Sequence, residues 1–101
     1  MNKEDMARLV EAFYDNDIKE ILTNEDGFIY FVNIDSKKDV FQYTDIRLSL
    51  IELDLMYKAF LGIIGNGFLK QFNWGITNNI ELFGSYFGQI PCIGIIKKNL
   101  I

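Results

Sequence analysis

The sequence contains no histidine, one cysteine (Cys92) and one proline (Pro91). Without histidine it lacks the side chain that most often acts as a general base near neutral pH, and the usual zinc or copper ligand. A single cysteine permits neither an internal disulfide nor a zinc site built on cysteines. None of Ser36, Ser49 and Ser85 lies in a Gly-x-Ser-x-Gly motif. We therefore expect no active site built on histidine, thiol or serine.

Long hydrophobic runs are also missing. The longest nearly apolar stretch, residues 55–64, contains Lys58 and is far shorter than the roughly 20 residues that span a bilayer. The opening residues MNKEDMARL are polar and charged where a secretory signal would need an apolar segment. A lone cysteine suits a reducing compartment. These features predict a cytoplasmic protein without a membrane segment.

Basic residues are too few and too scattered for a nucleic-acid interface. Ten basic residues stand against fourteen acidic ones, which gives a net charge of −4, and thirteen of the acids lie within residues 1–60. The basic doublets occur only at residues 37–38 and 97–98, whereas binding of phosphate backbones requires clustered lysine and arginine. We expect no nucleic-acid partner. Acidic charge would instead speed association with a basic protein.

Hydrophobic residues are plentiful, at 50% of the chain, and aromatic residues make up 15%. This apolar content is sufficient for a core without disulfides or metal. A chain of 101 residues has room for one such core. We expect a single domain spanning residues 1–101.

Two segments show the pattern of amphipathic helices. Apolar residues recur at helical spacing over residues 4–15. Ser49 and Glu52 match a capping box that opens a second helix over residues 50–64, and Gly65 is placed to end it. The second helix is more apolar than a surface helix requires, which predicts either a central position or contact with a partner.

Strands are predicted by apolar runs between turn residues. Residues 28–34 and 40–44 form the clearest hairpin, joined by the polar loop 35–39. Residues 18–23 fit either a strand or a helical turn, and residues 24–27 form a turn in which Gly27 adopts positive φ.

The C-terminal part is rich in glycine and aromatic residues, with seven of the eight glycines in residues 62–94. Residues 75–79, Gly84 and Gly88 predict breaks between two or three short strands. Pro91 places the last strand at an edge or begins it, with residues 92–96 following. The expected fold is α+β: an antiparallel sheet of about four to six short strands packed with two helices.

Motifs that could replace the missing histidine chemistry are poorly placed. Gly62, Gly65 and Gly67 fall at the end of a helix, where a phosphate-binding loop would have to precede one. Glu52 and Asp54 are two positions apart on a helix and point to different faces. We therefore expect no metal ion and no cofactor, and favour surface roles for the carboxylates.

The remaining functional signal is aromatic. Tryptophan and tyrosine beside glycine are typical of interface anchors, although most of these rings are expected in the core. The predicted partner-binding residues are Trp74, Tyr86, Phe87, Phe72 and Tyr57.

Three functions remain open from the sequence. The first is a small acidic binding protein that covers the surface of another, possibly basic, protein, as immunity, antitoxin-like or anti-defence inhibitors do. The second is a module that self-associates as a homo-oligomer or holds a small ligand. The third, a carboxylate- or metal-dependent enzyme, has the least support because its acids lie at unsuitable spacings.

Overall fold

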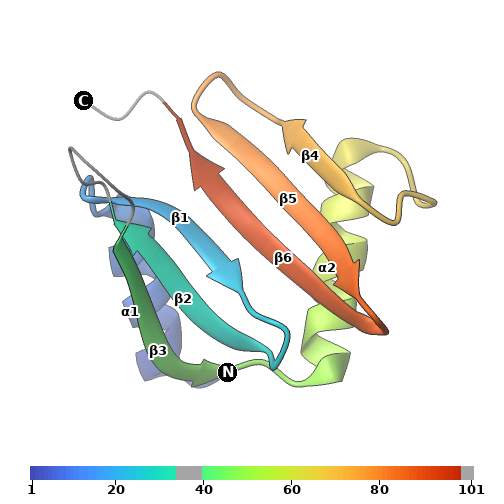
Figure 1. Ribbon diagram of the computed structural model, residues 1–101. Coiled ribbons are helices and arrows are strands. Elements are labelled where there is room, and N and C mark those ends of the chain that lie inside the picture. Colours follow the sequence, from blue (N-terminus) through green and yellow to red (C-terminus); the bar gives the residue numbers. More distant parts are fainter. Residues whose placement is uncertain (34–39, 99–101) are drawn as a thin grey trace.

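A six-stranded antiparallel sheet carries two helices on one of its faces (Figure 1). The structure is a computed structural model that describes residues 1–33 and 40–98. The elements in chain order are α1 Lys3–Tyr14, β1 Ile18–Thr23, β2 Phe28–Asn33, β3 Val40–Arg47, α2 Leu50–Ile64, β4 Phe72–Gly75, β5 Ile80–Phe87 and β6 Ile90–Lys97. The expected α+β fold with helices near 4–15 and 50–64 is confirmed.

The sheet consists of two three-stranded parts that meet at β1 and β6. The strand order is β3-β2-β1-β6-β5-β4, so each part follows one helix in the chain. Only three pairs of residues join β1 to β6, from Glu20–Ile96 to Leu22–Gly94. Beyond them the Thr23 hydroxyl accepts a hydrogen bond from the Ile93 amide at 3.0 Å, so a side chain extends the junction. We call this junction the β1–β6 seam.

The ends of α1 are fixed by side chains. The Asn2 side chain accepts a hydrogen bond from the Asp5 amide at 2.7 Å and so caps the start of the helix. At the other end, Lys97 of β6 donates to the carbonyl oxygens of Ala12, Phe13 and Asp15 at 3.2, 2.9 and 2.7 Å. A cation at the end of a helix interacts favourably with its dipole. Lys97 therefore ties the first helix to the last strand.

The predicted capping box opens α2. Ser49 Oγ accepts from the Glu52 amide at 3.1 Å, and the Glu52 carboxylate accepts from the Ser49 amide at 2.9 Å. Gly65 ends the helix with φ of 82°, a left-handed conformation that glycine adopts without steric penalty. The glycine-rich segment 62–67 is thus a helix end.

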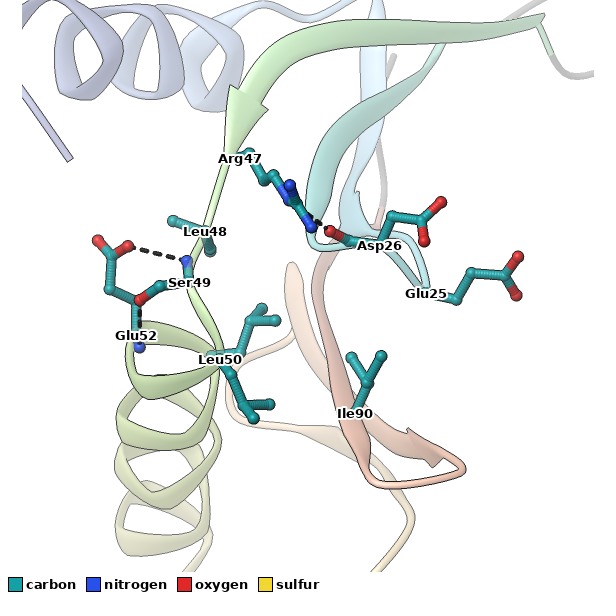
Figure 2. A pocket seen from close by; sticks show the side chains of 9 residues that line it. Glu25, Asp26, Arg47, Leu48, Ser49, Leu50, Glu52 and Ile90 are labelled. Atoms are coloured by element: carbon teal, nitrogen blue, oxygen red, sulfur yellow. Dashed lines mark hydrogen bonds between the residues drawn. The ribbon is translucent and has the colours of Figure 1, made fainter.

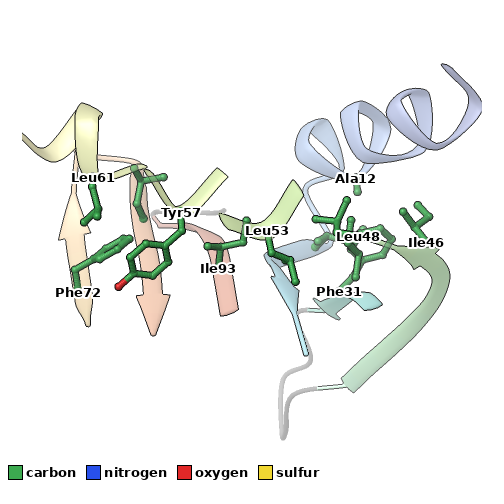
Figure 3. Close-up of a cluster of buried hydrophobic side chains, with 12 residues drawn as sticks. Ala12, Phe31, Ile46, Leu48, Leu53, Tyr57, Leu61, Phe72 and Ile93 are labelled. Carbon is green, nitrogen blue, oxygen red and sulfur yellow. The ribbon is translucent and has the colours of Figure 1, made fainter. Parts of the chain in front are cut away.

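The core lies between the helices and the sheet (Figure 3). Leu53, Tyr57 and Leu61 project from α2 onto β4–β6, and α1 contributes Ala12. Phe31 brings β2 into the same cluster. One continuous core therefore unites both parts of the sheet.

Three details of the strands differ from or complete the sequence analysis. Residues 18–23, which fitted either a strand or a helical turn, form a strand. Gly84 does not break a strand but lies within β5, because the ring of Phe72 occupies the space of a side chain there. Pro91 lies near the start of β6, where the strand pairs only with β5, so its missing N–H removes no bond to β1.

Gly27 has the expected positive φ, at 86°. The loop expected at 35–39 lies outside the described residues. Within the described ranges, neither helix has the length and apolar character needed to cross a membrane.

Candidate functional site

A surface cavity of about 480 Å³ lies where the β1–β2 turn approaches the start of α2 (Figure 2). Two of its charged side chains, Glu52 and Arg47, already have structural partners. Glu52 belongs to the capping box, and Arg47 Nε donates to the Asp26 carbonyl oxygen at 3.0 Å. Hydrogen bonding from the Ser49 amide is the main reason why the pKa of Glu52 is lowered. A lowered pKa keeps this carboxylate ionised, the opposite of what a general acid requires.

Residues 1–33 and 40–98 contain no group of three acidic or cysteine side chains placed to hold a metal ion. Cys92 is partly buried, and burial, with a smaller contribution from Glu25, raises the pKa of its thiol. A raised pKa leaves less of the nucleophilic thiolate at neutral pH.

The most distinctive surface is the face of the sheet that neither α1 nor α2 covers, which we call the open face. In Figure 1 both helices lie behind the sheet, so this face is turned toward the viewer. Ile29 and Phe31 point into the core, and strand alternation therefore directs Tyr30 to the open face. Strand pairing places Tyr43 of β3 directly opposite Tyr30.

Three aromatic rings form a row across β2 and β3 on the open face. Tyr30 stacks on Tyr43 with ring centres 5.3 Å apart, and the ring centre of Phe41, on the same strand as Tyr43, lies 6.2 Å from that of Tyr30. Tyr43 is 67% exposed and Phe41 is 56% exposed. We call Tyr30, Phe41 and Tyr43 the aromatic row. Together they present apolar ring surface to solvent on a rigid sheet.

A carboxylate lies beside the aromatic row. Glu20 of β1 pairs with Val32, the residue opposite Phe41, and so shares the open face. Burial is the main cause of a raised pKa at the Tyr30 hydroxyl, and the nearby Tyr43 and Glu20 raise it further. Tyr30 is therefore neutral at physiological pH, and Glu20 supplies negative charge next to the rings.

An arginine stacked on an aromatic ring already occurs between the same two strands. The guanidinium carbon of Arg47 lies 5.4 Å from the centre of the Phe28 ring. Phe28 and Arg47 are paired across β2 and β3. This contact shows that a guanidinium group fits over a ring projecting from these strands.

The five predicted partner-binding residues do not form one surface. Tyr57 and Phe72 are buried in the core, with ring centres 5.3 Å apart. Tyr86 packs on Tyr57 at 4.8 Å but remains 41% exposed. Phe87 follows Tyr86 and so points to the opposite face, and Trp74 lies on edge strand β4. Burial removes Tyr57 and Phe72 as direct contacts in this conformation.

The sequence analysis did not predict the aromatic row, although the sequence contains a pattern that indicates it. Phe41 and Tyr43 are two positions apart in a strand whose neighbouring residues, Gln42 and Thr44, are polar. Such alternation directs both rings to one face. The sequence did not show that this face would lack a helix.

Comparison with known proteins supplied no relative: no family model, curated protein or solved structure matches this chain.

Proposed function

We propose that this chain is a small binding protein that covers a basic surface of a partner protein with its open face. The observation that carries the proposal is the exposed aromatic row on the sheet face that neither described helix covers. The function class is that of inhibitory proteins of the immunity, antitoxin-like or anti-defence type, which act by occupying a surface.

Aromatic side chains and negative charge together suit a partner rich in arginine and lysine. Exposed apolar patches mark interaction sites, and tyrosine is enriched at interfaces. Arginine binds aromatic faces through cation–π contacts worth roughly 0.5–2 kcal/mol. Glu20 can pair with the same cations at the rim, and the net charge of −4 favours their approach. The open face thus offers two kinds of contact to a basic surface.

A protein partner is better supported than a small ligand. The apolar hollow enclosed between the helices and the sheet has a volume of about 110 Å³. Pockets for small molecules usually measure roughly 300–1,000 Å³ and are mostly apolar. The cavity of about 480 Å³ beside the β1–β2 turn has such a volume, but Arg47 and Glu52 in its lining are already hydrogen-bonded within the protein. The aromatic row, in contrast, lies on an open surface that a macromolecule can cover.

The test compares capture of a partner by the natural chain and by a Phe41→Ala/Tyr43→Ala double variant. The natural chain, immobilised and exposed to extract from its own host, should retain one basic protein in stoichiometric amount. The double variant should lose most of this capture because it loses two exposed rings. Tyr14→Ala is the matched control, since Tyr14 is also an exposed ring, at 76%, but lies on α1.

Controls of folding and of salt dependence make the result decisive. Both variants should keep the thermal unfolding midpoint of the natural chain within a few degrees, because the replaced rings are exposed. Capture should weaken as salt screens the charges. Equal capture by the double variant and the Tyr14→Ala control would refute the role of the open face.

A further inference from the structure

Helix α2 has apolar residues on both its inner and its outer side. Leu53, Tyr57 and Leu61 are buried against the sheet. On the outer side Ile51 is 73% exposed and Leu55 is 61% exposed. These two residues are one turn apart and form a strip with Lys58 and Gly62 farther along the helix. We call the strip formed by these residues the outer strip: Ile51, Leu55, Lys58 and Gly62.

A projecting ring and a hollow lie at opposite ends of the same side of α2. Phe68, just beyond the end of the helix, is 94% exposed. A hollow of about 320 Å³ lies near the start of the helix and is lined by Leu50, Ile51 and Leu55. Tyr86 borders both this hollow and the groove that contains Phe68. The surface therefore carries both a knob and a depression that could receive one.

We infer that this surface binds a second copy of the same chain, with the two α2 helices antiparallel about a two-fold axis. A two-fold interface must be complementary to itself, because the same patch occurs on both sides. In the antiparallel arrangement the end carrying Phe68 meets the start of the other helix, where the hollow lies. Each copy then supplies one knob and one hollow.

The charges at and beside the outer strip also fit the antiparallel arrangement of the two helices. Asp54 and Lys58 lie one turn apart and form an ion pair of 2.9 Å within the helix. Reversing the second helix brings Lys58 of one copy beside Asp54 of the other. A parallel alignment in register would bring like charges together and is disfavoured. Charge thus favours the antiparallel dimer.

Side-chain size is also complementary. A two-fold axis between Leu55 and Lys58 places Ile51 opposite Gly62 of the second copy. A side-chain carbon added at Gly62 would meet no atom within 4 Å, so the space above this glycine is free. A large side chain can therefore pack against the bare backbone of the other helix. A partner of different sequence would need only one of these two features, either the large side chain of Ile51 or the free space above Gly62. A second copy of the chain uses both.

The decisive experiment uses two opposite charge variants, Asp54→Lys and Lys58→Asp. Each variant alone places like charges across the proposed axis, so each should be monomeric where the natural chain is dimeric. An equimolar mixture should form a heterodimer, because two lysines then face two aspartates. Sedimentation equilibrium from micromolar to millimolar concentration should give about twice the 11.7 kDa mass of one chain for the natural protein and for the mixture.

The mixture separates the intermolecular effect from the ion pair within the helix. Both variants lose that intrahelical pair, which is exposed to solvent and adds little to stability. Mixing cannot restore an intrahelical pair, so recovery of the dimer on mixing can arise only between chains. Leu55→Glu should also give a monomer, whereas Val10→Glu on the exposed side of α1 should leave the dimer intact.

Several outcomes would overturn the inference. These are a natural chain that stays monomeric at millimolar concentration, a Leu55→Glu variant that still dimerises, or charge variants that do not recover on mixing. The dimer does not depend on the proposed partner-binding function. Phe41→Ala/Tyr43→Ala should dimerise normally, so failure of one proposal leaves the other unaffected.

Discussion

Gly84 lies in the middle of β5, where the ring of Phe72 from the neighbouring strand packs over its backbone. Glycine in the interior of a strand usually weakens it, because glycine has no side chain to pack. Here the missing side chain makes room for a buried ring that also contacts Tyr57. The identity of residue 84 is therefore set by a neighbour in space and not by a turn.

Replacing Gly84 with alanine should destabilise the protein. The added carbon would overlap the Phe72 ring, which is buried and has little freedom to move. Overpacking of this kind costs about 1–3 kcal/mol in the free energy of unfolding. Urea denaturation should show this loss for Gly84→Ala. Gly67→Ala, where an added carbon meets nothing within 4 Å, should stay close to the natural chain. Equal stability of the two variants would contradict the packing argument.

At this scale the sequence predicted what kinds of residue matter but not where each side chain points. Tyr57 and Phe72 were expected at an interface and are buried, whereas Phe41 and Tyr43 were not singled out and are exposed. Aromatic content alone does not distinguish core from surface, because both environments favour aromatic rings. Only the position of the helices decides which face is covered.

Among the elements, α2 was predicted most accurately because its boundaries depend on local contacts. Ser49 and Glu52 are three positions apart, and Gly65 needs only its own backbone freedom. Strand β6 was harder, since its place between β1 and β5 depends on residues far away in the chain. Local sequence signals determine where an element begins, whereas tertiary packing determines which elements lie beside it.

The capping box should make stability depend on acid pH. The pKa of Glu52 is below its ordinary value of 4.5 in the folded state, chiefly because of the Ser49 amide. A lowered pKa stabilises the fold above pH 4.5, and this contribution is lost as the pH falls through the folded value. Glu52→Gln keeps a capping residue of the same shape but removes the titration.

The measurement is urea denaturation of both proteins at several pH values from neutrality to acid. The natural chain should exceed Glu52→Gln in stability at neutral pH, and the difference should shrink on acidification. The contribution is small because the carboxylate is partly exposed to solvent, which screens its interactions. If the difference in unfolding free energy between the two proteins did not change with pH, ionisation of Glu52 would not contribute to stability.

For the molecule as a whole, the β1–β6 seam is the narrowest connection within the sheet. It comprises three paired positions, whereas β5 and β6 pair over eight. Thr23 supplements the seam, since its buried hydroxyl accepts from the Ile93 amide at 3.0 Å and donates to the Ile93 carbonyl at 3.4 Å. A single side chain thus completes the hydrogen bonding where the two strands diverge.

Thr23→Val should weaken the whole fold. Valine has the same shape as threonine but leaves the buried amide of Ile93 without a partner, at a cost of about 1–3 kcal/mol. Thr23→Ser keeps the hydroxyl and should lose less. Thermal unfolding of the two variants should show the larger drop for valine. If valine were the more stable replacement, the hydroxyl would not support the seam.

The seam also bears on the order in which the chain assembles. Leu22 and Gly94, which pair across it, are 72 positions apart, whereas the strands within each part of the sheet follow one another closely in the chain. Closing a long loop carries an entropic penalty that local hairpins avoid. The two meanders should therefore form early, each beside its own helix, and dock to one another late. A ribosome must release every residue from β1 to β6 before the two strands can meet, so throughout that interval the nascent chain carries β1 with one edge unpaired.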